Sequence, residues 1–86
     1  MNTIMVNLKN FTLAHDIYVL GENNNLLDRY SSSMKNMAEN IVEKCSFYNS
    51  TKVKLIGNKK YANKICQDIK TLGMTKYNLS LDIEIL

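Results

Sequence analysis

A strand that runs directly into an amphipathic helix constrains the fold of this chain more than any other feature. In the segment Lys52–Leu72 (KVKLIGNKKYANKICQDIKTL), a short apolar run ends at Gly57 and Asn58. Apolar side chains then recur at helical spacing from Tyr61 onward. A strand followed by a helix is half of a βαβ crossover, and the alternating segment Leu79–Leu86 supplies the returning strand. The segment therefore predicts parallel strands joined by a helix.

Three more strands are predicted before this unit. Alternating side chains indicate strands over Met1–Leu8 and Asp16–Leu20, with Lys9–His15 as the connection between them. The stretch Gly21–Asn25 predicts a turn, because Gly and Asn tolerate positive φ. The run Leu26–Tyr30 then pairs back as a third strand, so the first three strands form an antiparallel meander.

Two helices complete the predicted elements. The clearest amphipathic pattern lies over Met34–Tyr48, where apolar residues recur at steps of three and four. The serines Ser31–Ser33 precede it and offer an N-cap. The second helix is predicted over Lys59–Leu72, and Gly73 is placed to end it in a left-handed conformation.

The predicted order of elements is β-β-β-α-β-α-β. Right-handed crossovers then give the strand order 3-2-1-4-5 and put both helices on one face of the sheet. We therefore expect an α+β fold, a five-stranded mixed sheet with two helices, as a single domain over residues 1–86. No remaining element covers the other face of the sheet.

That uncovered face is predicted to be an interface. It bears Met5, Asn7, Tyr18 and Leu20, which alternate along their strands with core residues. Exposed together, the large side chains of Met5, Tyr18 and Leu20 form an unusual apolar patch for a small monomer. Self-association, or a different protein partner, would cover it.

Two stretches resemble the ribonuclease H-like fold in residues as well as in topology. The segment Leu55–Ala62 (LIGNKKYA) is similar to that family's fourth strand and following turn, and Ser31–Ala38 (SSSMKNMA) is similar to the start of its first helix. The resemblance implies a two-metal nuclease site, but Asn7, Lys35 and Asn58 stand where the family keeps carboxylates. Amides are poor ligands for hard divalent cations, and a lysine repels them. The resemblance therefore implies a catalytically degenerate member without metal or other cofactor.

A lysine cluster gives a second candidate site. Lys59, Lys60 and Lys64 lie at the start of the second helix beside Asn58, where the helix dipole adds to their positive field. They could receive a phosphate of a nucleic acid, although lysines on a solvated helix face are also common. The net charge of +3 permits nucleic-acid contact, but the single arginine, Arg29, argues against base-specific reading.

Two further groups of polar residues could carry chemistry. His15, the only histidine, stands beside Asp16, but neighbours on a strand point to opposite faces and cannot easily act as base and orienter. Asp82 and Glu84 share one strand face. They could hold a cation, or pair with Lys54 on the neighbouring strand.

The remaining features predict an ordinary intracellular protein. Cys45 and Cys66 lie among apolar residues at helical spacing, which is typical of reduced core cysteines. No segment approaches the ~20 apolar residues that a membrane span needs, so we expect a cytoplasmic protein without membrane contact.

These features favour a small non-enzymatic binding protein that occupies a host protein, for example by inhibiting a defence or nucleic-acid enzyme. Its small size and its richness in asparagine and lysine are typical of phage or mobile-element genes. Two alternatives remain open. One is a nucleic-acid-binding module that uses the lysine cluster, and the other is a small metal-dependent nuclease with an unrecognised site.

Overall fold

The structure is a computed structural model that describes residues 1–10 and 13–86. Within these residues the elements follow the predicted order, with one short 3-10 helix added between β2 and β3. Phe11 and Thr12, in the predicted first connection, lie outside the described residues. The elements are β1 (Thr3–Leu8), β2 (His15–Leu20), η1 (Glu22–Asn24), β3 (Leu26–Ser32), α1 (Met37–Phe47), β4 (Lys52–Gly57), α2 (Lys59–Tyr77) and β5 (Asp82–Ile85).

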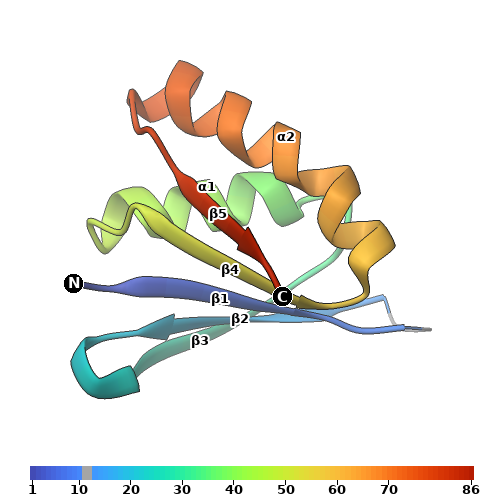
Figure 1. The fold of residues 1–86 in the computed structure, drawn as a ribbon, viewed down its shortest axis with the longest axis horizontal. Coiled ribbons are helices and arrows are strands. Elements are labelled where there is room, and N and C mark those ends of the chain that lie inside the picture. Colours follow the sequence, from blue (N-terminus) through green and yellow to red (C-terminus); the bar gives the residue numbers. More distant parts are fainter. Residues whose placement is uncertain (11–12) are drawn as a thin grey trace.

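The five strands form one mixed sheet in the order β3-β2-β1-β4-β5. β2 pairs antiparallel with both β1 and β3, whereas β4 pairs parallel with both β1 and β5. The α+β fold and the strand order predicted from the sequence are confirmed. Both crossovers run the same way across the sheet, so α1 and α2 lie on one face of it, and Figure 1 shows both helices above β1, β2 and β3.

The hydrophobic core fills the space between the two helices and the covered face of the sheet. Along β1 every second side chain is buried, and Ile4, Val6 and Leu8 are at most 1% exposed. Each such large apolar side chain contributes roughly 1.5–3 kcal/mol when it is fully buried. The core cluster consists of Ile4, Val6, Leu8, Ile17, Val19, Met37, Ile41, Val42, Cys45, Val53, Leu55, Ala62, Ile65, Ile69 and Leu81.

The first helix begins later than predicted, at Met37 rather than Met34. The predicted serine cap is wrong, because the chain continues as β3 through Ser32 before it turns toward the helix. Ser32 is buried, and its hydroxyl accepts a hydrogen bond from Asn40 Nδ2 at 2.7 Å. Asn36 occupies the N-cap position without a capping side-chain bond. The serine thus joins a strand to a helix side chain instead of capping that helix.

The second helix runs past Gly73 to Tyr77, so the predicted glycine terminator is also wrong. The left-handed residue that ends the helix is Asn78, with φ 55°. Gly73 is buried, and a Cβ there would lie 2.9 Å from Leu81 Cδ1. The glycine therefore lets the chain that returns to β5 pass close to the helix. β5 itself is shorter than the predicted Leu79–Leu86, although apolar side chains still alternate with exposed ones along it.

Both cysteines have free thiols, as predicted. Cys45 lies in the core, and burial raises the pKa of its thiol to about 12. Cys66 is only partly buried and does not belong to the core cluster, so its predicted place in the core is wrong. In the described part of the chain, neither helix combines the length and apolar character needed to cross a membrane.

Replacing Gly57 tests the turn between β4 and α2. Its φ is 98°, and a Cβ at this position would lie 2.2 Å from the backbone oxygen of Leu8. Gly57→Ala should lower the free energy of unfolding by at least about 2 kcal/mol, because backbone strain and a steric clash act together. Urea unfolding followed by circular dichroism measures the change.

Gly21→Ala is the matched control for this substitution. Gly21 has an ordinary φ of −88°, and its added Cβ would meet only the flexible side chain of Leu27, at 3.1 Å. We expect a much smaller loss of stability. Equal losses in the two variants would show that the conformation of Gly57 is not a constraint.

Candidate functional site

The side of the sheet opposite the helices, here named the helix-free face, has no covering element among the described residues. Strand register arranges its side chains in three rows across the sheet. From β3 toward β5 the rows are Ser31–Asp16–Asn7–Ile56, Arg29–Tyr18–Met5–Lys54–Glu84 and Leu26–Leu20–Thr3–Lys52–Asp82.

The four residues predicted to form an interface all belong to this face. Met5, Asn7, Tyr18 and Leu20 are partly exposed, while the residues that alternate with them are buried in the core. The strand faces assigned from the sequence are therefore correct. Binding of a partner by these residues stays a prediction.

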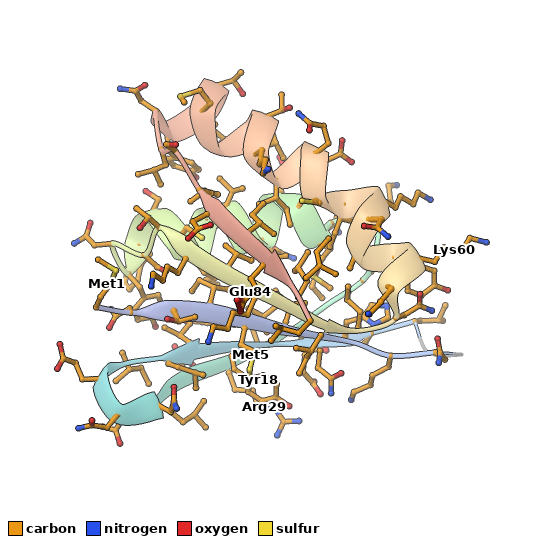
Figure 2. The ribbon with its side chains drawn as sticks, in the orientation of Figure 1. Met1, Met5, Tyr18, Arg29, Lys60 and Glu84 are labelled. Atoms are coloured by element: carbon orange, nitrogen blue, oxygen red, sulfur yellow. The ribbon has the colours of Figure 1, made fainter. Side chains whose placement is uncertain are left out.

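The middle row, here named the central row, carries opposite charges at its two ends. Arg29 lies on the edge strand β3 and Glu84 on the edge strand β5, with Tyr18, Met5 and Lys54 between them. Four of these side chains, all except Lys54, are labelled one above another in Figure 2. The Arg29 guanidinium lies 5.6 Å from the centre of the Tyr18 ring, a cation–π contact. Met5 and Tyr18 thus form an apolar and aromatic part of the row, and the charged residues are Lys54 and the two ends.

A polar cluster beside the central row is organised by Asp16. Its carboxylate lies 2.7 Å from Lys9 Nζ and 3.6 Å from Arg29 Nη2, and it accepts a hydrogen bond from the Tyr18 hydroxyl at 3.3 Å. The hydrogen bond from Lys9, with the charges of Lys9 and Arg29, holds the pKa of this carboxyl below its usual range. Asp16 thus contacts both Tyr18 and Arg29 on the face.

At the other end of the face, β4 and β5 line a shallow hollow of about 160 Å³. Register places Lys54 opposite Glu84, and Lys52 opposite Asp82. No three His, Cys, Asp or Glu side chains in the described part of the chain gather closely enough to hold a metal ion. The arrangement therefore favours the lysine pairing over the cation site that the sequence left open, and it adds Lys52, which the sequence analysis did not consider.

At the predicted phosphate site at the start of α2, Asn58 already forms hydrogen bonds within the protein. The Asn58 backbone N–H donates to the Leu8 oxygen at 2.8 Å, and its Oδ1 accepts a bond from the Tyr61 N–H at 3.1 Å. Its Nδ2 donates to Asn10 Oδ1. Asn58 therefore serves as a helix cap and as a link to the end of β1. The lysines predicted beside it, Lys59, Lys60 and Lys64, are exposed on α2, and Figure 2 shows Lys60 well away from the central row.

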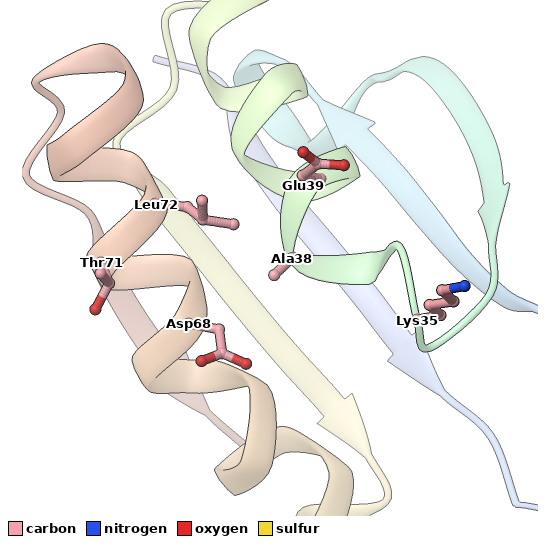
Figure 3. Close-up of a pocket in the computed structure, with 6 residues that line it drawn as sticks. All are labelled: Lys35, Ala38, Glu39, Asp68, Thr71 and Leu72. Carbon is pink, nitrogen blue, oxygen red and sulfur yellow. The ribbon is translucent and has the colours of Figure 1, made fainter.

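The residues at the resembled family's carboxylate positions lie on different sides of the molecule. Asn7 belongs to the helix-free face, whereas Lys35 lines a groove between α1 and α2 on the helix side. This groove, shown in Figure 3, has a volume of about 420 Å³. Its other lining residues are Ala38, Glu39, Asp68, Thr71 and Leu72.

His15 is a buried core residue, which the sequence did not reveal because it was assigned to a connection. The residue begins β2, and its side chain is 0% exposed. Its Nδ1 accepts a hydrogen bond from the Lys9 N–H at 2.9 Å, so the neutral ring carries its proton on Nε2. Asp16 lies on the other face of the strand, as predicted, and the two do not form a catalytic pair.

Comparison with known proteins adds no relative from which a function could be transferred. No protein-family model matches the chain, and no curated protein matches it significantly. The functional argument therefore depends on the geometry described above.

The pH dependence of stability tests the environment of His15. Burial, and secondarily the charge of Lys9, lowers the pKa of His15 from its ordinary value of 6.5. The folded protein therefore binds a proton at His15 more weakly than the unfolded chain does. The contribution of neutral His15 to the free energy of unfolding is complete above about pH 6.5 and is lost as the pH falls through the folded pKa. Thermal unfolding should show a stability that declines as the pH falls below about 6.5.

His15→Asn is the matched control, because its side-chain oxygen can still accept a hydrogen bond from Lys9 but does not titrate. The variant should lack this decline. Any loss due to Asp16 comes at lower pH, below that carboxyl's usual value of 3.8. An NMR titration in which His15 protonates near pH 6.5 in the folded protein would contradict its burial.

Proposed function

We propose that this chain is a non-enzymatic binding protein of the cytoplasm whose helix-free face docks onto another protein. The observation that carries the proposal is the partly exposed group of Met5, Tyr18 and Leu20 among the charged residues of this face, with no element of the described chain above it. Interfaces between proteins commonly have an apolar and aromatic centre within a polar rim. Inhibition of a defence or nucleic-acid enzyme by occupation is a mode of action that suits a protein of this size.

The charges of the face favour a protein partner over a nucleic acid. Asp16, Asp82 and Glu84 lie on the same face as Arg29 and the two β4 lysines. Carboxylates repel the phosphate backbone, which supplies most of the affinity of nucleic-acid-binding surfaces. A surface with both signs suits a protein whose charges are complementary.

We further propose that the chain is a degenerate member of the ribonuclease H-like fold. The strand order and the two helices are compatible with that fold. Asn7, Lys35 and Asn58 stand at the positions of its carboxylates, which supports a role without catalysis. Metal-dependent cleavage of an RNA–DNA hybrid by the purified protein would favour the nuclease alternative instead.

A nucleic-acid-binding module remains the second candidate function. One observation favours it: Lys59, Lys60 and Lys64 are all exposed at the start of α2, and none lies in an ion pair among the described residues. Such lysines attract phosphate together with the positive end of the helix dipole. This surface lies on the helix side and is separate from the helix-free face.

Affinity capture from a lysate of the source cells separates these two functions. The wild type, Met5→Lys and a triple variant with Lys59, Lys60 and Lys64 changed to Ala are compared in parallel. A charge at position 5 disrupts this group of Met5, Tyr18 and Leu20, so Met5→Lys should reduce recovery of the protein partner at least tenfold. The triple variant should recover it as the wild type does, with or without nuclease treatment.

Two results would contradict the proposal. Loss of the captured partner after nuclease treatment or in the triple lysine variant would favour the nucleic-acid candidate. A partner recovered equally by all three proteins would show that neither surface is the binding site.

A further inference from the structure

The residues of the central row are placed evenly on the two sides of β1. β1 is the middle strand of five, so the central row extends two strands to each side of Met5. One end of that row is the cation Arg29, and the other end is the anion Glu84. An aromatic ring, Tyr18, and a second cation, Lys54, occupy the two intermediate positions.

A second copy of the chain can meet this row with complementary groups at every position. When a copy is turned by 180° about an axis that runs along β1 between two facing sheets, its β5 edge lies over the β3 edge of the first. Arg29 then faces the partner's Glu84, and Tyr18 faces the partner's Lys54. These are an ion pair and a cation–π pair, and the two-fold axis produces each of them twice. Met5 lies on the axis and meets the partner's Met5.

We infer that the occupant of the helix-free face is a second copy of this chain, packed sheet against sheet about a two-fold axis along β1. The inference rests on the proposed function, because it names the protein that occupies the same face. The self-complementarity of the central row is the reason to choose a second copy over a foreign protein, since each charge of that row finds its opposite, or an aromatic ring, on an identical surface. The two outer rows do not add pairs of this kind.

The size of the face indicates a weak dimer. Five strands at a spacing of about 4.8 Å and six residues at about 3.3 Å each give a face of roughly 24 by 20 Å. That is about 500 Å² per copy, less than the ~800 Å² per partner of a standard stable interface. The dimer should therefore be weak and exchange readily, which leaves the face available to another protein at low concentration.

Reciprocal charge exchange tests the pairing through sedimentation velocity at up to ~500 μM, a range that covers weak dimers. Arg29→Glu places two acidic groups opposite each other, and Glu84→Lys places two basic groups opposite each other. Each variant alone should dimerise at least tenfold more weakly than the wild type. An equimolar mixture of the two variants restores both attractive pairs, so the mixture should dimerise as the wild type does. Lys60→Glu, an exposed charge change on α2, is the control and should leave the dimer intact.

Three results would overturn the inference. The first is a wild type that remains monomeric over the whole range, and the second is a mixture that stays as monomeric as its components. The third is a dimer that persists in Met5→Lys, a variant that puts two lysines together on the axis. This variant does not alter Arg29 or its contact with Asp16, so it tests the dimer independently. Circular dichroism of each variant confirms that it is folded.

A wild type that does not dimerise would not by itself contradict the proposed function. If the wild type is monomeric but Met5→Lys still abolishes capture of a foreign protein, the face binds that protein and only self-pairing is wrong. If Met5→Lys changes neither self-association nor capture, the helix-free face is not a binding surface and both proposals fail.

Discussion

The turn between β4 and α2 is the constraint on which the rest of the architecture depends. Gly57 adopts a positive φ that brings its Cα against the backbone of Leu8, where a Cβ would not fit. The next residue, Asn58, bonds the end of β1 through its backbone and caps α2 through its side chain. Two adjacent residues thus join the parallel strands β1 and β4 and start the helix that crosses back over them. The direction of both crossovers, and hence the one-sided sheet, follows from this parallel pairing.

A one-sided sheet gives its two faces different chemistry. On the helix side even the polar groups serve the fold: His15 is buried there, and the Asp28 carboxylate accepts hydrogen bonds from the hydroxyls of Tyr30 and Tyr48. The bonds to Asp28 join the edge strand β3 to the residue that ends α1, and they hold the pKa of Asp28 below its usual range. On the opposite side, Tyr18 and its neighbours have no covering layer among the described elements. This difference between the two faces of the sheet is the physical reason to propose the helix-free face as the binding surface.

The sequence predicted the layers of this protein better than its local junctions. Alternation in the strands and periodicity in the helices identified all five strands, both helices and the strand order, because both patterns reflect burial against one core. The ends of the helices depended on tertiary packing: Ser32 continued a strand, and Gly73 was needed for close approach rather than for a turn. Strand register determines which charged residues share the central row, and alternation alone does not determine the register. For the same reason the pairing of Lys54 with Glu84 was only one of the alternatives open to the sequence.

The central claim is that the helix-free face, and not the helix side, is the surface that binds protein. Amide NMR spectra of the uniformly ¹⁵N-labelled wild type, recorded over a dilution series from ~500 to ~10 μM, test it most directly across the range of a weak dimer. The account predicts shift changes centred on Met5, Tyr18 and Lys54, with little change at exposed α2 residues such as Lys60. Changes confined to the two helices would contradict it, whereas spectra that do not change with concentration would contradict only the pairing of two copies.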